Sequence, residues 1–150
     1  DVGGLEKERN ILRYRPASTQ VRGCADAKLV DVARVVAAGL LAAGDNISVC
    51  LDPSLGEGLG RALRSVGVAV TTASDEDWYA SLGASRVRLV GGNPSRAADE
   101  ADGDPDLALW ANEVTSAPQV ELLPFLREQS VSMTAHRFGN PDAGVLSVRL

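Results

Sequence analysis

The stretch Ile47–Val70, ISVCLDPSLGEGLGRALRSVGVAV, decides the fold class because it reads as strand, turn, helix and strand. Its first residues form a continuous apolar run, which is typical of a strand buried on both faces of a parallel sheet. Asp52 and Pro53 then predict a helix start, with Asp52 as N-cap, and Gly67 predicts the helix end. A unit of this kind indicates an α/β fold.

The same rhythm runs through most of the chain. A helix is predicted over Asp26–Ala43, with Asp26 as N-cap, Gly44 as terminator and an inward face of Leu29, Val32, Ala33, Val36 and Leu40. Further helices are predicted to begin at Ser74 and Asn93, strands at RVRLV (86–90) and DLALWA (106–111), then a helix at LLPFLREQ (122–129) and a strand at SVSMTAHRF (130–138). The pattern predicts a doubly wound, mainly parallel Rossmann-like sheet with helices on both faces.

The segment NILRYRPASTQVRG (10–23) alternates apolar and basic residues and is interrupted by Pro16. It is therefore expected to be a lead-in edge strand or connector. We accordingly divide the chain into a lead-in linker, residues 1–23, and a Rossmann-like domain, residues 24–150.

Composition excludes several partners. The net charge of −5 argues against a nucleic-acid surface, which needs a basic face. No apolar run reaches about 18 residues, so we expect no transmembrane helix. We also expect no signal peptide at the start of this sequence. Cys24 and Cys50 are isolated and suit a reducing cytoplasm. Cys50 is expected to be an inert core thiol, and Cys24 to lie exposed in a loop.

The glycines Gly56, Gly58 and Gly60 invite comparison with a dinucleotide fingerprint, but their spacing is G-x-G-x-G rather than G-x-G-x-x-G. The helix start at Pro53 places them inside the helix, where they would allow close packing on the sheet. Gly91 and Gly92, which precede Asn93, are equally suited to an anion site and to an ordinary strand-to-helix turn. For both motifs we favour the structural interpretation and keep nucleotide binding as the alternative.

Residues for catalysis are scarce. His136 is the only histidine, so no second imidazole is present to complete a metal site with it. Glu121 and Glu128 are expected to lie on the surface. We therefore predict no catalytic residue, no metal site and no bound cofactor in this chain. A free-standing small dehydrogenase fits the sequence least well.

Two stretches nevertheless resemble a known family. They are GLEKERNILRYRP (4–16) and VELLPFLREQSVSMTAHRFGNP (120–141). Together they resemble the C-terminal part of bifunctional proline dehydrogenase/L-glutamate γ-semialdehyde dehydrogenases, the proline utilisation A family, in its actinobacterial type. Neither cysteine lies in a GQ-x-C context, and no E-L-G-G-K segment is present, so the signatures of the catalytic aldehyde dehydrogenase half are missing.

The resemblance implies a parent enzyme that oxidises proline with FAD and then oxidises L-glutamate γ-semialdehyde to glutamate with NAD. It further implies that this chain is the parent's noncatalytic aldehyde-dehydrogenase-like domain, which covers the substrate tunnel. The parent would be cytoplasmic or membrane-peripheral. The expected partner is the rest of the parent polypeptide, and a second copy of the chain is the other partner considered. The residues expected at the interface are Glu8, Asn10, Arg13 and Tyr14 in the first stretch and His136, Arg137, Phe138 and Gly139 in the second.

Overall fold

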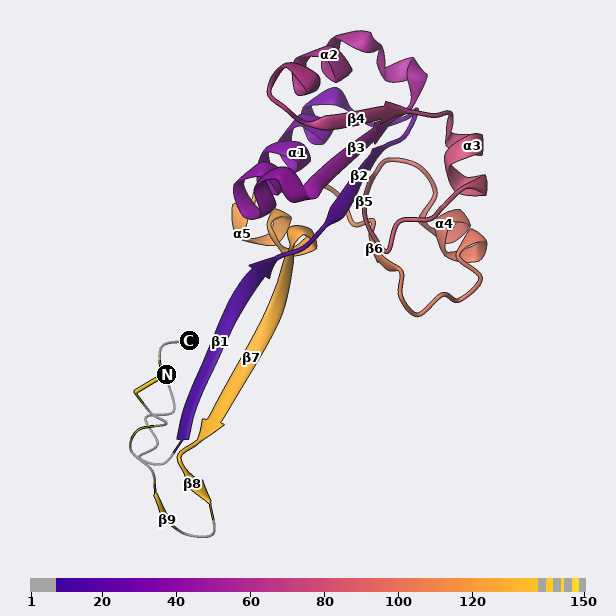
Figure 1. Cartoon of the computed structure of the whole chain (residues 1–150). Helices are drawn as coiled ribbons and strands as arrows, with labels where there is room; N and C mark the ends of the chain where they lie inside the picture. Colours follow the sequence, from indigo (N-terminus) through magenta and orange to yellow (C-terminus); the bar gives the residue numbers. More distant parts are fainter. Residues whose placement is uncertain (1–7, 138–139, 142–143, 145–146, 149–150) are drawn as a thin grey trace. The chain divides into compact units, whose positions relative to one another are not determined.

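The computed structural model describes residues 8–137, 140–141, 144 and 147–148 (Figure 1). By internal contacts the chain divides into two compact units. One is Pro16–Leu126, and the other combines Asp1–Arg15 with Arg127–Leu150.

The larger unit is built on five strands in the order β4-β3-β2-β5-β6, and every neighbouring pair is parallel. The strands are β2 (Thr19–Gly23), β3 (Ile47–Leu51), β4 (Ala69–Thr72), β5 (Arg86–Val90) and β6 (Ala108–Trp110). Numbered along the chain within this sheet, the order is 3-2-1-4-5, which is the arrangement of a Rossmann fold. The predicted α/β class and parallel sheet are confirmed.

The position predicted for residues 19–23 is wrong, because β2 is the central strand of the sheet and not a lead-in edge strand. Its polar residues suggested exposure, yet each finds a partner inside the protein. The Thr19 hydroxyl donates to the Pro124 carbonyl at 3.0 Å, and the Gln20 side chain accepts from the Trp78 indole at 2.8 Å. Arg22 is fully buried and pairs with Asp75.

Helices cover both faces of the sheet (Figure 1). On one face lie α1 (Leu29–Ala43), α2 (Glu57–Ser65), α5 (Pro118–Glu121) and the 3₁₀ turn η3 (Leu123–Phe125), and on the other lie α3 (Asp75–Ala80) and α4 (Pro94–Glu100). The first face packs mainly valines and leucines around the fully buried Phe125. The second packs Trp78 and Tyr79 against Val87 and Leu89. Two cores of this kind suit a sequence with few aromatic residues.

Two predicted helix starts are confirmed. The Ser74 hydroxyl accepts from the amide of Asp77, and Asn93 Oδ1 accepts from the amides of Ser95 and Arg96. These capping bonds satisfy donors that the first helical turn leaves without intrahelical acceptors. At both positions the capping side chain predicted from the sequence makes its bond to a nearby backbone amide.

The start predicted for the first long helix is wrong. The helix begins at Leu29 and not at Asp26, and its N-cap Lys28 makes no capping side-chain bond. Asp26 Oδ1 instead accepts from the amide of Gly92 at 2.6 Å. The inward face is also rotated, since Leu29 and Ala33 are exposed whereas the helix buries Val32, Val35, Val36, Gly39 and Ala43.

The glycine-rich segment forms two short elements rather than one helix. Asp52 caps the 3₁₀ turn η2 (Pro53–Leu55), with its side chain accepting from the Ser54 amide. Gly56 then has φ +79°, which ends that turn before α2 begins at Glu57. Gly58 and Gly60 therefore lie in the helix as predicted, and Gly56 does not. A second 3₁₀ turn, η1 (Gly44–Asn46), follows α1.

The helix predicted over residues 122–129 is also wrong. The chain forms η3 there and then enters the nine-residue strand β7 (Leu126–Thr134), which pairs with β1 (Glu8–Pro16). Leu, Arg, Glu and Gln favour helices, but pairing with a strand distant in sequence overrides that preference. The strand predicted over residues 130–138 is thus the later part of β7 followed by β8 (His136–Arg137).

The smaller unit contains a two-stranded ribbon of β1 and β7, which run in opposite directions (Figure 1). β8 pairs with β9 (Asn140–Pro141) as a second short antiparallel pair. In the described part of the chain, no helix combines the length and apolar character needed to cross a bilayer.

Candidate functional site at the carboxyl edge of the sheet

The ligand site of a Rossmann fold lies at the switch point, where consecutive connections leave the sheet in opposite directions. In this sheet that point is between β2 and β5. Two turns meet there, residues 23–28 after β2 and residues 91–93 after β5; we call them the switch-point turns. Gly91 and Gly92 lie in the second of the switch-point turns. Gly56, Gly58 and Gly60 follow β3 and belong to the second strand–helix connection.

A dinucleotide fingerprint would therefore have to follow β2, where the sequence is GCADAK. Only Gly23 of that stretch is a glycine. A Cβ added there would lie 3.1–3.2 Å from side-chain atoms of Leu51, Leu55 and Val32, so Gly23 serves close packing within the sheet and α1. The first strand–helix turn lacks the remaining glycines that let a backbone approach a pyrophosphate.

Several backbone amides of the switch-point turns donate to acceptors of the protein itself. The amide of Cys24 donates to the Val90 carbonyl at 3.0 Å, and that of Ala25 donates to Asp75 Oδ2 at 3.1 Å. In the turn after the neighbouring strand β5, the amide of Gly92 donates to Asp26 Oδ1. The amide of Asn93 donates to the Tyr79 hydroxyl at 2.8 Å. In a nucleotide-binding relative, amides of the turn after the first strand hold the phosphate oxygens. Here the amides of Cys24 and Ala25 in that turn are already bonded within the protein.

The space beside these amides is also filled. Gly91 and Gly92 have φ of +72° and +73°, which favours glycine. A Cβ on Gly91 would collide with Asp26 Oδ1 and lie 3.0 Å from the Ala27 amide nitrogen, and one on Gly92 would lie 2.5 Å from Cys24 Sγ. The absence of side chains at the two glycines thus leaves the space that the turn between β2 and α1 occupies.

An open cavity of about 370 Å³ remains next to the switch-point turns. Its ionisable lining consists of three carboxylates and one amine, from Asp26, Asp31, Glu113 and Lys28. A surface with this excess of negative charge repels a pyrophosphate. Electrostatics and hydrogen bonding therefore both disfavour a dinucleotide here.

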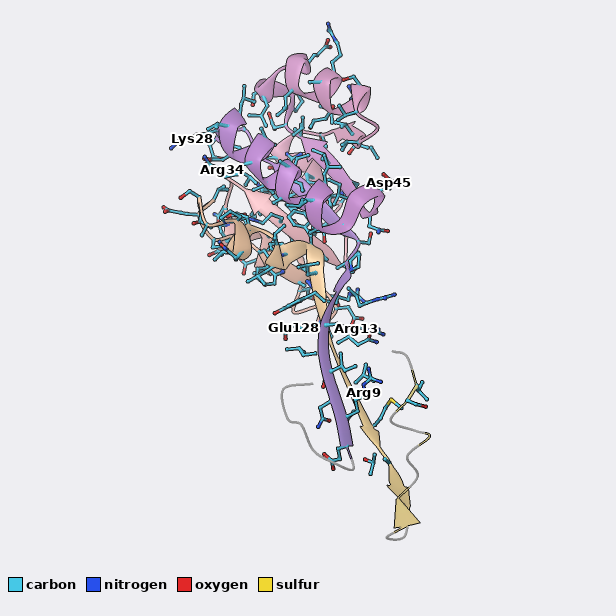
Figure 2. The ribbon with its side chains drawn as sticks, turned by 90° about the vertical axis from the view of Figure 1, so that its left-hand side faces the viewer. Arg9, Arg13, Lys28, Arg34, Asp45 and Glu128 are labelled. Atoms are coloured by element: carbon cyan, nitrogen blue, oxygen red, sulfur yellow. The ribbon has the colours of Figure 1, made fainter. Side chains whose placement is uncertain are left out.

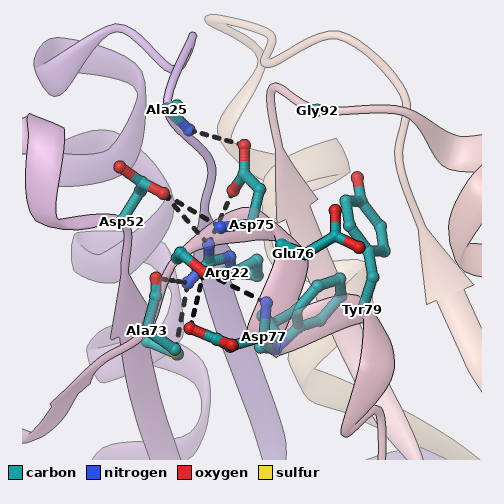
Figure 3. Close-up of polar contacts among 12 residues, drawn as sticks. Arg22, Ala25, Asp52, Ala73, Asp75, Glu76, Asp77, Tyr79 and Gly92 are labelled. Atoms are coloured by element: carbon teal, nitrogen blue, oxygen red, sulfur yellow. Dashed lines mark hydrogen bonds and ion pairs between the residues drawn. The ribbon is translucent and has the colours of Figure 1, made fainter.

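Arg22 organises the floor of this edge (Figure 3). Its guanidinium is fully buried and forms an ion pair with Asp75 at 2.6 Å. It also donates to the Ala73 carbonyl at 3.1 Å and to Cys50 Sγ at 3.2 Å, and it lies over the Trp78 ring. Burial lowers the pKa of Arg22, but the hydrogen bond with Asp75 and the neighbouring thiols outweigh it and the pKa ends above its usual value.

Asp52 directly follows β3 and so occupies the place where a dinucleotide-binding relative holds the ribose with an acidic residue. Here both oxygens of its carboxylate accept hydrogen bonds from the protein itself. Oδ1 accepts from the Ser54 hydroxyl at 2.6 Å, and Oδ2 accepts from the Asp75 amide at 3.0 Å. The Ser54 hydroxyl is the main reason that the pKa of Asp52 lies below its usual value, with further contributions from backbone amides and from Arg22.

Both cysteines are buried free thiols, so the exposure expected for Cys24 is wrong. Burial raises the pKa of Cys24 to about 12, and the nearby Asp75 carboxylate adds to this effect. A thiol of this kind stays protonated at neutral pH and is a poor nucleophile. The structure thus provides a physical reason why Cys24 is unsuited to covalent catalysis.

The glycines of the second connection border a larger open cavity of about 530 Å³. Gly56 and Gly60 line it together with Arg61 and Arg64. Gly58 has open space at its Cβ position, so no close approach explains it. Only Gly60 meets sheet side chains, at 3.8 Å from Leu51 and Val70, which supports the expected packing role for this one glycine.

The expected interface residues of the first stretch lie on β1. Arg13 Nε donates to Gln129 Oε1 at 2.7 Å, and the Tyr14 hydroxyl donates to Glu128 Oε1 at 3.3 Å, both on β7. Glu8 and Asn10 lie earlier on the same strand. Exposed Glu128 agrees with its predicted surface role.

In the second stretch, His136 and Arg137 form β8, where they pair through the backbone with Pro141 and Asn140. Phe138 and Gly139 fall outside the described residues. The interface role of these eight residues stays a prediction.

The surface role predicted for Glu121 is wrong. The residue is 2% exposed, and its carboxylate forms a bidentate pair with the fully buried Arg88 at 3.1–3.3 Å. Arg88 also donates to the carbonyls of Leu89, Trp110 and Asn112. The pair therefore fastens the chain after β6 to the centre of the sheet.

Sequence reasoning missed both buried arginines. Their signal was an arginine between valine, leucine or glycine in a strand, as in QVRG and RVRLV. Such a residue requires a carboxylate partner inside the protein. Among the residues that the structure describes, His, Cys, Asp and Glu nowhere gather in threes as a metal site would need.

Comparison with known proteins gives little beyond this geometry. No family model matches the chain, and no curated protein matches it. Among solved structures, it is similar to one titled "Structure of Proline Utilization A (PutA) from Corynebacterium freiburgense", at 25% sequence identity and a TM-score of 0.47. The similarity covers 93% of this chain and 12% of that chain.

Proposed function

We propose that this chain is a noncatalytic Rossmann-like domain of a bifunctional proline-catabolic enzyme, where it covers the substrate tunnel and packs on the catalytic aldehyde dehydrogenase region. The observation that carries the noncatalytic part is the state of the switch point. The amides of Cys24, Ala25, Gly92 and Asn93 are already bonded to the chain's own acceptors. The scaffold is that of a cofactor binder, and its ligand-holding groups are used for structure.

The assignment to a proline-catabolic enzyme is supported by the resemblance of residues 4–16 and 120–141 to that family. In the structure, the described parts of these two stretches contain the two strands of one ribbon, β1 and β7. Segments that are far apart in sequence and resemble the same family thus form a single element. Such an element is a natural place for contact with the parent.

The ribbon also needs a partner for physical reasons. An isolated two-stranded ribbon is marginally stable in water. Leu12 and Tyr14 on β1 are 65% and 51% exposed. Contact with the parent would cover these side chains and provide the further packing that two strands lack.

In the parent, this domain would break no bond and bind neither NAD nor FAD. Its contribution would be to exclude water and to retain the aldehyde between the two catalytic steps. Both cofactors would belong to the catalytic halves, and the domain would share the parent's cytoplasmic or membrane-peripheral location.

The test is removal of this segment from the longer polypeptide. We expect a lag in NADH formation from proline, because the semialdehyde escapes, while oxidation of added semialdehyde stays unchanged. Measuring both rates in the same preparation separates a tunnel defect from a damaged dehydrogenase. Unchanged coupled flux together with an unchanged oligomeric state would remove the proposed role.

A second candidate function, an independent nucleotide-binding module, rests on the cavity beside Gly56 and Gly60. Arg61 and Arg64 line it and could face a phosphate. It ranks lower because Glu57 occupies the first turn of α2 and pairs with Arg61 at 3.5 Å. A negative side chain at that helix end competes with an anionic ligand. Nucleotide titration distinguishes the two functions.

A further inference from the structure

The ribbon of β1 and β7 has two faces, and two side-chain bonds show which residues share each face. Arg13 Nε donates to Gln129 Oε1 at 2.7 Å, and the Tyr14 hydroxyl donates to Glu128 Oε1 at 3.3 Å. Side chains that meet across two strands lie on one face, and successive residues of a strand alternate between faces. Arg13 and Glu128 therefore lie on opposite faces of the ribbon (Figure 2).

One of these faces is basic, and we call it the arginine face. The other face holds the exposed Leu12 and Tyr14 together with both carboxylates of the two strands, Glu8 and Glu128. The described residues of the arginine face include four arginines and no carboxylate; they are Arg9, Ile11, Arg13 and Arg15 of β1 and Arg127, Gln129, Val131 and Met133 of β7. Positive charge is thus concentrated on one face of the ribbon in a protein with a net charge of −5.

Two arginines of this face oppose each other. The register set by the two side-chain bonds places Arg15 directly opposite Arg127. Both residues are exposed, and neither forms an ion pair with any residue that the structure describes. The Cβ atoms of opposite residues lie about 5 Å apart, and like charges in such a pair weaken the association of the strands. An anion between the two guanidinium groups would remove this repulsion.

We propose that the arginine face binds an acidic polypeptide segment, with one carboxylate of that segment seated between Arg15 and Arg127. A guanidinium group is planar and donates two parallel bonds to a carboxylate, which suits arginine to this contact. Arg13 lies on the same face two residues from Arg15, or about 7 Å along β1, where it meets a second carboxylate of the segment. Alternate side chains of an extended segment have the same spacing.

A polypeptide segment is favoured over a nucleic acid or an anionic membrane because of the charge of the whole chain. Nucleic acids and membranes present negative charge over a wide area, so they would also meet the excess negative charge of this protein. A short segment contacts only the arginine face. The identification of that segment as part of the parent polypeptide rests on the proposed function, whereas the chemistry of the face does not.

The first experiment titrates the 150-residue chain with a hexaglutamate peptide at low ionic strength, followed by calorimetry and by NMR of the arginine Nε–H groups. We expect saturable binding that weakens with salt, with the largest shifts at Arg15 and Arg127. Arg15→Gln and Arg127→Gln should each raise the dissociation constant at least about tenfold. Arg61→Gln is the matched control, since that side chain is 80% exposed on α2, and it should leave the constant unchanged. A hexaglutamine peptide should not bind.

The second experiment tests whether Arg15 and Arg127 share one carboxylate. If they do, the double variant should bind little more weakly than either single variant, whereas separate contacts would give losses that multiply. Circular dichroism and melting temperature check that every variant folds.

Four results would each overturn the proposal. They are the absence of saturable hexaglutamate binding, an equal loss in Arg61→Gln, losses that multiply in the double variant, and equally tight binding of phosphatidylserine vesicles through the same arginines. Because the experiments use this chain alone, their failure would leave the deletion test of the longer polypeptide unaffected. Failure of that deletion test would likewise leave the binding chemistry of the arginine face in place.

Discussion

Arg22 and Arg88 are the two fully buried arginines of the larger unit. Each is fully buried on a central strand and meets a carboxylate from a later part of the chain. A buried ion pair gives little net stability relative to apolar residues, but removing one partner leaves an uncompensated charge. These pairs therefore fix how the segments fit together more than they add to stability.

At Arg88 this predicts a large effect from a small change. Glu121→Gln should lower the free energy of unfolding by about 3–5 kcal/mol, because it leaves the Arg88 charge buried without its counter-ion. Urea denaturation measures the change. Glu128→Gln is the control, since Glu128 is exposed and its loss should cost less than about 0.5 kcal/mol. Similar losses in the two variants would contradict the buried pair.

Cys24 predicts a particular alkaline destabilisation. Its pKa is raised from an ordinary value of 9.0 to about 12, so the folded protein keeps the proton while the unfolded chain releases it. The stabilisation is complete below pH 9 and is lost as the pH rises toward 12. The loss is at most a few kcal/mol, since one pKa unit corresponds to about 1.4 kcal/mol.

Chemical denaturation at a series of alkaline pH values measures this loss. Cys24→Ala should flatten the pH dependence between 9 and 12. Burial also raises the pKa of Tyr79, and Tyr79→Phe therefore serves as a parallel comparison for the tyrosine's own contribution. If the slope in Cys24→Ala equals that of the wild type, the thiol is not the source.

At the scale of elements, the turn after β5 shows why glycines occur at the switch point. Gly91 and Gly103 have the same φ, +72°, but only Gly91 has protein atoms against its Cβ position. Gly103→Ala should cost about 1–2 kcal/mol from backbone strain alone. Gly91→Ala should cost at least about 1 kcal/mol more, because the methyl group meets Asp26 and Ala27. Thermal or urea unfolding of the two variants measures the difference, and equal costs would show that the turn is not closely packed.

Local signals predicted some elements and failed for others. Ser74 and Asn93 were identified as caps because a side chain and an amide two or three residues later make the whole interaction. Asp26 has the same cap chemistry, but Gly92 from another turn takes its carboxylate. Residues 126–134 contain helix formers, yet they pair with β1 at the other end of the sequence. What the sequence could not reveal was which distant segment would compete for a group.

The position of the candidate site could not be predicted from the sequence, because it depends on which distant strands pair. The strand that begins the Rossmann order contains Thr19, Gln20 and Arg22, which suggested an exposed edge. The glycine-rich sequence lies instead at the second strand–helix connection, at Gly56–Gly60. Only the strand order shows that the ligand position follows β2.

At the scale of the whole molecule, we propose that a Rossmann-like scaffold uses the polar groups near its switch point for internal bonds instead of for a ligand. Asp52, Asp75 and Asp26 each accept a backbone amide of the protein near the switch point. A dinucleotide would have to displace these internal bonds and overcome repulsion from the surrounding carboxylates.

Titration of the 150-residue chain with NAD⁺, followed by amide NMR shifts and calorimetry, tests this most directly. The account predicts no saturable binding up to about millimolar ligand. Saturable micromolar binding, with the largest shifts at the amides of Ala25, Gly91 and Gly92, would contradict it.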